Sequence, residues 1–218
     1  MSSDETLRQL SSAIVKGDSL ATEQIAKQLV EKGGPVTATL DAITDAMNIV
    51  NDLHSIGEYD RSKFSTSSRT TLTTLRALEP QFSIEESKAI GKLVLGCIPE
   101  DRVGLDSAMA SSVLRAAGFK TFVLSTEVTY NNLVSIASQN KCDLAVLLIK
   151  TYEDDPRVQS LASELSGSLP KNILKVLVGG NLEPARLCRK YGFTNYFRDL
   201  ADLVSKATEI VIRERESR

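Results

Sequence analysis

The sequence predicts a two-part fold, a four-helix bundle followed by an α/β domain built on a five-stranded parallel sheet. Two observations predict it. Residues 3–78 carry only helical apolar spacing, and after residue 89 short continuous apolar runs alternate with helical segments. Strands buried on both faces read as continuous apolar runs, and strict alternation implies a parallel sheet with right-handed crossovers. We expect a helical domain at 1–80, a linker at 81–89 and a flavodoxin-like, Rossmann-like domain at 90–218.

The N-terminal part is predicted to form four helices joined by short loops, the pattern of a bundle. Each helix carries an apolar stripe at helical spacing and ends at a breaker residue. These breakers are Gly17, Gly33, Gly57 and Pro80. The fourth helix, about 60–78, has the weakest signal, because Ser and Thr crowd residues 60–74 and are weak helix formers.

The C-terminal part is predicted to form five strands separated by helices of ordinary length. The strands are expected at 92–98, 120–125, 143–149, 173–178 and 195–197. The helices are expected at about 105–117, 129–140, 156–168, 184–191 and 200–215. The loop after the first strand lies at a carboxyl edge, which is where open α/β sheets bind ligands.

Composition excludes several classes of function. The formal net charge of −2 gives no basic field for nucleic acid. No apolar run approaches the ~20 residues of a membrane span, and the polar N-terminus is not a secretory signal, so we expect a cytoplasmic protein. Three well-separated cysteines favour reduced thiols. A single histidine, His54, excludes a His-rich metal site and leaves no visible nucleophile–base pair.

Three stretches of the chain carry a family resemblance. They are IVNDLHSIGEYDRSKF at 49–64, LGCIPEDRVGLDSAMASSVLRAAGFK at 95–120 and VLVGGNLEPARLCRKYGF at 176–193. Together they resemble the cobalamin-binding module of corrinoid methyl-carrier proteins and of cobalamin-dependent methionine synthase. The resemblance covers almost the whole chain and implies the same two-part fold, with cobalamin as the expected cofactor.

The loop after the first strand departs from the family pattern. The family loop reads Asp-x-His-x-x-Gly, in which the His binds cobalt from below and the Asp orients that His. Here the loop runs from Asp101 through Arg102, Val103 and Gly104 to Asp106. Asp101 is kept, but Val103 stands at the ligand position and has no lone pair for a metal. Asp106 replaces the glycine, although a carboxylate near a helix start also suits the helix dipole.

The nucleotide-tail motifs of the family are only partly present. Its Ser-x-Leu motif falls on residues 148–150, so Leu148 replaces the serine that hydrogen-bonds the buried base. Gly179 and Gly180 match the family's Gly-Gly, which lets the tail lie against the backbone. Lys150, like Arg102 and Arg61, is a candidate contact for phosphate or propionamide groups, or else a solvated charge.

The cap over the cobalt also differs. In methyl carriers the bundle presents a Phe and, seven residues later, usually a Leu, and these positions fall on His54 and Arg61. His54 has two readings, a helix-end histidine or an upper axial ligand to a tetrapyrrole metal.

The losses of the ligand histidine and of the apolar cap set the functional expectation. We expect a non-catalytic sensor, regulatory or partner-binding module that uses the bundle–sheet cleft for a corrinoid or another tetrapyrrole such as haem, with an empty pocket as a further reading. The alternative is a corrinoid methyl-carrier subunit that serves a methyltransferase, and an enzyme label would come only from that role. A protein partner, either a regulator or a methyltransferase, is expected in both cases.

Overall fold

The structure is a computed structural model that describes residues 3–33, 35–82, 84–99, 104–124, 128–150, 155–168, 175–180 and 183–216. Its contacts divide the chain into two compact units. The helical unit comprises Met1–Ser83 together with Val103–Ala116, and the sheet unit comprises Ile84–Arg102 together with Ala117–Arg218. The expected division at 1–80, 81–89 and 90–218 stays a prediction, and the packing groups one later helix with the bundle.

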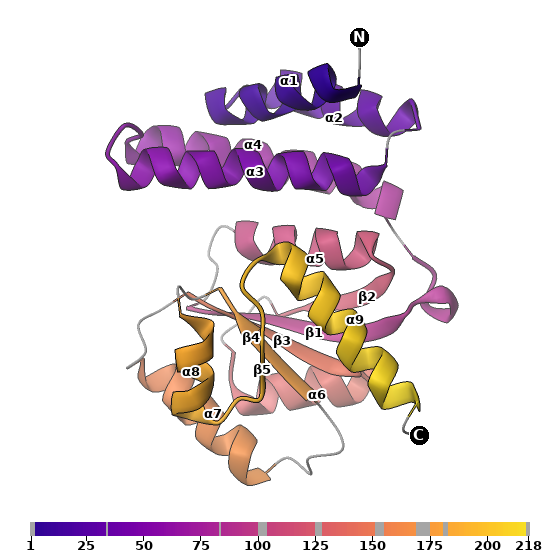
Figure 1. The fold of residues 1–218 in the computed structure, drawn as a ribbon, viewed down its shortest axis with the longest axis vertical. Coiled ribbons are helices and arrows are strands. Elements are labelled where there is room, and N and C mark those ends of the chain that lie inside the picture. Colours follow the sequence, from indigo (N-terminus) through magenta and orange to yellow (C-terminus); the bar gives the residue numbers. More distant parts are fainter. Residues whose placement is uncertain are drawn as a thin grey trace. The chain divides into compact units, whose positions relative to one another are not determined.

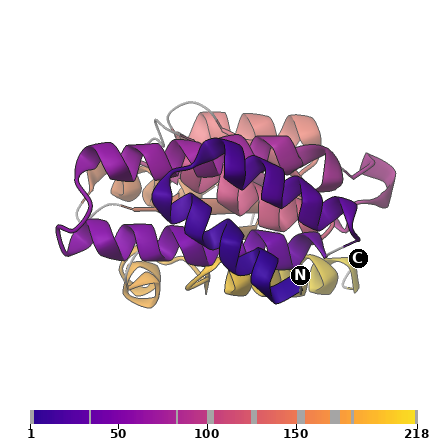
Figure 2. The same cartoon turned by 90° about the horizontal axis from the view of Figure 1, so that it is seen from above.

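The helical unit contains the predicted bundle and that later helix, α5 (Figures 1 and 2). Its helices are α1 (Ser3–Lys16), α2 (Ser19–Glu31), α3 (Val36–Ser55), α4 (Arg61–Leu78) and α5 (Leu105–Ala116). Side chains cap two of them: Asp18 accepts from Ala21 N at 3.0 Å, and Asp60 accepts from Lys63 N at 2.8 Å. Such caps satisfy helix N–H groups that have no intrahelical partner.

One apolar core joins these helices. It is formed by the stripes that predict the helices, including Leu10, Ile43 and Leu75. Phe82 also belongs to it, although the residue lies in the predicted linker and in a short 3₁₀ helix, η1 (Glu79–Phe82). Leu105 of α5 completes the core, and Arg115 of α5 pairs with Glu79.

The Ser/Thr-rich helix α4 forms over the predicted range because its hydroxyls find carbonyl partners. Thr74 Oγ1 donates to Thr70 O at 2.9 Å within the helix. Ser67 Oγ donates to Val15 O and Thr70 Oγ1 to Gly17 O, both at 3.2 Å, so α4 satisfies the carbonyls at the end of α1. Thr71 is fully buried, and its hydroxyl has no hydrogen-bond partner among the described residues.

The sheet unit confirms the predicted fold class. Its strands are β1 (Gly91–Ile98), β2 (Phe119–Val123), β3 (Leu144–Ile149), β4 (Lys175–Gly179) and β5 (Asn195–Tyr196). They form one sheet in the order β2-β1-β3-β4-β5, and all the pairs are parallel. This is the flavodoxin-like order, whose ligand-binding switch point lies between the carboxyl ends of β1 and β3.

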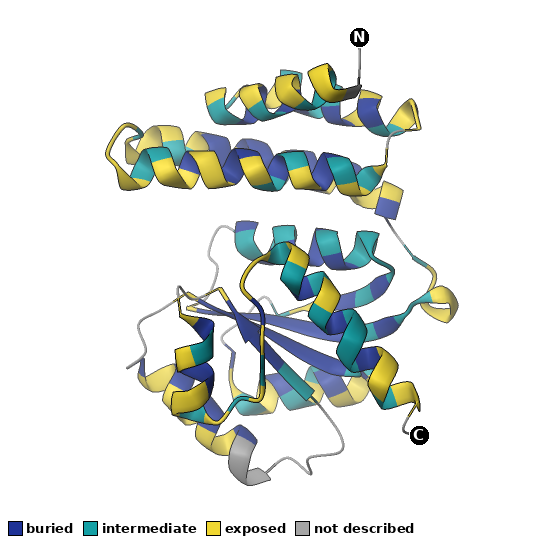
Figure 3. Ribbon diagram, in the orientation of Figure 1, coloured by how far each residue is buried: buried dark blue, intermediate teal, exposed yellow. Residues whose placement is uncertain are grey.

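Helices cover both faces of the sheet (Figure 1). The helices of this unit are α6 (Tyr130–Asn140), α7 (Pro156–Ser168), α8 (Pro184–Tyr191) and α9 (Leu200–Glu216), and a short 3₁₀ helix, η2 (Glu86–Lys88), precedes β1. One core unites α6, α7 and α8 with Val94, Leu147 and Val178 of the strands. On the opposite face α9 approaches the sheet, where a Cβ built on Gly91 would lie 2.8 Å from Val211 Cγ1. Figure 3 shows the central strands β1 and β3 buried between these layers, whereas the edge strands β2 and β5 are partly exposed.

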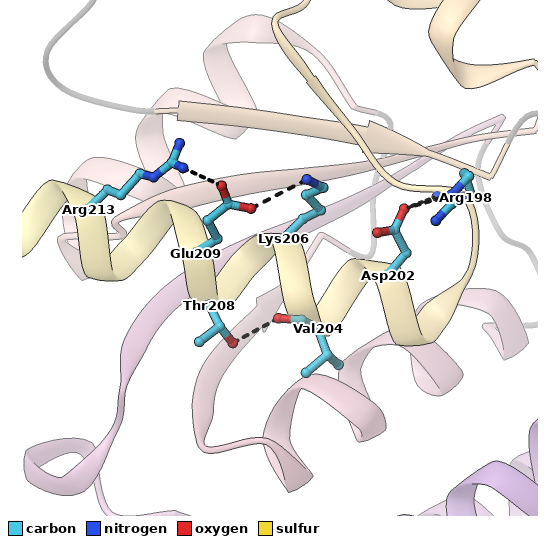
Figure 4. Close-up of polar contacts among 7 residues, drawn as sticks. All are labelled: Arg198, Asp202, Val204, Lys206, Thr208, Glu209 and Arg213. Atoms are coloured by element: carbon cyan, nitrogen blue, oxygen red, sulfur yellow. Dashed lines mark hydrogen bonds and ion pairs between the residues drawn. The ribbon is translucent and has the colours of Figure 1, made fainter.

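The outer side of α9 carries a ladder of charges (Figure 4). Glu209 pairs with Arg213 at 2.7 Å and with Lys206 at 3.4 Å, and Asp202 pairs with Arg198 at 3.3 Å. Because these side chains are partly or largely exposed, each pair stabilises the helix only slightly. Among the described residues, no helix is long and apolar enough to cross a membrane.

Candidate functional site

His54 lies in the last turn of α3 and is held by the turn that follows. Its Nδ1 is 2.8 Å from the carbonyl oxygen of Tyr59. Because a carbonyl can only accept, Nδ1 carries the hydrogen in this bond, and in the neutral ring Nε2 then keeps its lone pair. The hydrogen bond therefore selects the tautomer that leaves Nε2 as the electron-pair donor.

Aromatic side chains fix the orientation of the His54 ring. Phe64 of α4 stacks on it with ring centroids 4.6 Å apart and an interplanar angle of 28°. Tyr59 is anchored in turn, since its N donates to Leu53 O at 3.0 Å and its hydroxyl to Val15 O at 2.8 Å. The imidazole is therefore half-buried, and it is held by the carbonyl of Tyr59 and by the ring of Phe64 in α4. A histidine at a solvated helix end would lack these contacts.

The other predicted residues of the helical unit are placed less specifically. Arg61 is the first residue of α4 and is exposed. Gly104 precedes α5 with φ +78°, and its carbonyl accepts from Ala108 N at 3.0 Å. Asp106 lies in the first turn of α5, where its charge favours the helix dipole. Asp101, Arg102 and Val103 lie outside the described residues.

In the sheet unit, three residues form a row near the carboxyl edge. Leu148 is the register partner of both Cys97 in β1 and Gly179 in β4. Paired residues of parallel strands present their side chains to the same face, and here it is the face covered by α9, because Cys97 shares its side of β1 with Gly91. Leu148 is 5% exposed and Cys97 is 7% exposed, so the row is buried and offers no side-chain amide or carboxylate.

The missing side chain of Gly179 makes room for Phe197. A Cβ built on Gly179 would lie 2.4–2.5 Å from three ring carbons of Phe197, far inside the ~3.5–4.0 Å of normal carbon contacts. Phe197 is 2% exposed, and its N donates to Val178 O at 2.9 Å. The close approach that the Gly-Gly pair predicts is therefore present, and the group that makes it is a phenylalanine of this chain.

Lys150 and Gly180 also lie together at this edge. A Cβ built on Gly180, which has φ +82°, would lie 3.5 Å from Lys150 Cγ and 3.4 Å from Ile149 N. The Lys150 side chain is exposed, and its backbone N donates to Ile98 O at 2.7 Å. The structure thus brings together Leu148, Lys150, Gly179 and Gly180 in one unit, while His54, Arg61, Gly104 and Asp106 belong to the other.

Two of the three cysteines are poorly suited to bind a metal. Burial raises the pKa of Cys142 to about 11 and that of Cys188 to about 11, so both stay protonated thiols at neutral pH. Across the described ranges, no group of three or more His, Cys, Asp and Glu side chains could hold a metal ion.

Comparisons with known proteins extend this description. Residues 6–79, which span the four-helix bundle, match the family described as B12 binding domain. Dimethylamine corrinoid protein 1 of Methanosarcina mazei is 26% identical, with 97% of this chain and 98% of the relative covered. The monomethylamine corrinoid protein of Methanosarcina barkeri has the same fold, with a TM-score of 0.77, 19% identity and coverage of 96% and 100%. The methanol:cobalamin methyltransferase complex of Methanosarcina barkeri gives a TM-score of 0.50, 16% identity and coverage of 98% and 84%.

These relatives overturn one expectation from the sequence. The expected sensor or regulatory role is wrong, because the relatives that match the chain from end to end are corrinoid proteins for methylamines. The same matches favour a corrinoid over haem, because the matched domain is a B12 binding domain.

The described residues fit a corrinoid in one respect and restrict it in another. His54 supplies an imidazole nitrogen, the kind of atom that ligates such metals. Beside Gly179, in contrast, Phe197 and Leu148 fill the space and offer a nucleotide base no hydrogen-bond partner from their side chains. Sequence reasoning missed Phe197 and Phe64, whose only signal is that each is an apolar aromatic residue near a strand end or a helix start.

Proposed function

We propose that this chain, a homologue of the corrinoid proteins with a B12 binding domain at residues 6–79, is the corrinoid-binding, methyl-carrying subunit of a methyltransferase system. The observation that carries the proposal is the match to dimethylamine corrinoid protein 1 over 97% of this chain and 98% of that relative. A fragment match would identify a domain, whereas an end-to-end match supports the same kind of subunit.

The partner in this proposal is a methyltransferase that acts on a small methylated compound. Relatives of this chain are named for dimethylamine and trimethylamine, and one structural neighbour is a methyltransferase complex for methanol. These compounds are one class of methyl donor, small amines and alcohols with methyl groups on nitrogen or oxygen. When bound, the corrinoid supplies a cobalt centre that can accept and release that methyl group.

The chain's own residues would contribute binding and orientation. His54, in the helical unit, would offer its imidazole nitrogen to the metal. The loop at 101–103 would bring no imidazole from below, because Val103 replaces the histidine there. The proposed carrier therefore differs from its family in the ligands of its metal, while it keeps the fold.

Reconstitution tests the proposal in two stages. The purified chain is incubated with hydroxocobalamin or, separately, with haemin, and each sample is then passed through a desalting column. We expect the protein fraction from the hydroxocobalamin sample to keep the visible absorbance of the corrinoid. The protein fraction from the haemin sample should show no haem absorbance. Absence of retained corrinoid would refute the proposal.

The second stage measures methyl transfer. The corrinoid-loaded chain is reduced and mixed with a dimethylamine methyltransferase and dimethylamine, and formation of the methylated corrinoid is followed by its absorbance. Omission of the methyltransferase is the control. Retained corrinoid with no methylation by any methylamine or methanol methyltransferase would show binding without the carrier role.

A further inference from the structure

We infer that His54 is an axial ligand to the metal of the corrinoid, through Nε2, and this assignment rests on the proposed function. It concerns the helical unit only, because every contact that sets His54 lies there. No other residue of the chain can supply an imidazole, since the sequence contains one histidine.

A lone histidine is better suited to ligate the metal of a corrinoid than to form a metal site made of protein side chains alone. A protein-only site needs several converging ligands, and across the described parts of the chain no such cluster exists. A corrinoid differs, because its ring occupies the four equatorial positions of the metal and leaves only axial positions for the protein. One oriented nitrogen is then a sufficient contribution from the chain.

The hydrogen bond of His54 prepares it for a metal. Histidines that bind metals almost always donate their other ring N–H to a carboxylate, a backbone carbonyl or water, which fixes the tautomer and raises the basicity of the ligating nitrogen. His54 has this arrangement, with Nδ1 on Tyr59 O at 2.8 Å. No described residue forms a hydrogen bond with Nε2, so the lone pair on that atom is available.

The position of the ring is also set before any ligand binds. Stacking on Phe64 at 4.6 Å holds the ring on one side, and the Tyr59 turn is tied to α1 through the hydroxyl bond to Val15 O. A side chain that is already oriented loses little conformational entropy when it binds. These contacts orient the ring before a ligand binds, at the position where the family that the sequence resembles has an apolar cap.

The single histidine makes a direct test available. The chain is produced with ¹⁵N-histidine and with ordinary histidine, and each form is loaded with cob(II)inamide, which lacks the nucleotide base. In a buffer without nitrogen ligands, any axial nitrogen then comes from the protein. We expect electron paramagnetic resonance to show a three-line splitting with ordinary histidine and a two-line splitting with ¹⁵N-histidine.

Variants provide the controls. His54→Ala should lose the nitrogen splitting, and added imidazole should restore it. Ser55→Ala changes an exposed residue next to His54 that makes none of these contacts, and it should keep the splitting. Retained cobinamide or cobalamin with no histidine-dependent splitting would overturn the ligand assignment and leave the proposed function standing. Failure to retain either corrinoid would overturn the proposed function itself, and with it this assignment.

Discussion

Gly179→Ala should destabilise the protein because the new methyl group would meet the ring of Phe197. The added Cβ would lie 2.4–2.5 Å from three ring carbons, so the ring would have to move by about 1 Å to reach normal contact. Phe197 is 2% exposed, so its ring would have to move within the packed interior. Overpacking of this kind costs about 1–3 kcal/mol, and we expect the upper end.

The assay is thermal and urea unfolding followed by circular dichroism. A loss of about 3 kcal/mol should lower the melting temperature by about 6–12 °C in a chain of this size. Gly179 has no left-handed φ, so the backbone itself can accept an alanine. In a Phe197→Leu background the same substitution should therefore cost much less, with a coupling energy of roughly 1–3 kcal/mol.

An equal cost of Gly179→Ala in both backgrounds would refute this reasoning, because the ring would then not be the obstacle. The same variants also test whether Gly179 makes room for Phe197 alone or for a bound ligand as well. If Gly179 makes room only for Phe197, the double variant should retain cobalamin as well as Phe197→Leu does. Weaker retention in the double variant would show that a ligand uses the same space.

Three further outcomes are expected. Thr71→Val should raise the free energy of unfolding by about 1 kcal/mol, because it removes a buried hydroxyl that lacks a partner among the described residues. Thr74→Val should lower the free energy of unfolding by about 1 kcal/mol, since it removes the hydrogen bond to Thr70 O. Mass spectrometry should find Cys142 and Cys188 alkylated far more slowly in the folded than in the urea-unfolded chain, because burial raises the pKa of each thiol to about 11. Between pH 9 and pH 11 the unfolded chain loses these protons first, so the urea midpoint should fall as the pH rises; a flat midpoint would contradict the burial of the thiols. Glu209→Gln should change stability by less than ~1 kcal/mol, and 1 M salt should abolish the difference.

The order of the elements could be predicted from sequence because each element carries its own local signal. Runs such as Leu93–Ile98 are apolar on both faces, which is typical of a strand inside a parallel sheet. The range of the Ser/Thr-rich helix α4 could be predicted from sequence, but the reason for its stability could not. Its hydroxyls bond carbonyls at the end of α1, and no local sequence pattern reveals these partners. The polar neighbours of Phe82 predict a linker, yet its side chain is buried in the helical core.

The candidate site could be predicted only in part, for a similar reason. The Gly-Gly pair predicts that something approaches the backbone, but Phe197 comes from a later strand end, and only the fold brings it to Gly179. At His54 the sequence left two readings open. The contact that bears on them is a backbone carbonyl, Tyr59 O, and a backbone acceptor leaves no trace in the residue types.

The grouping of α5 with the helical unit has a consequence for synthesis on the ribosome. Leu105 belongs to the core of the first four helices, so that core cannot be completed until α5 has left the exit tunnel. By then β1, which belongs to the other unit, has already been made. The nascent chain must therefore carry an exposed, unpaired apolar strand while its first unit finishes folding, and a chain shortened before residue 105 should aggregate.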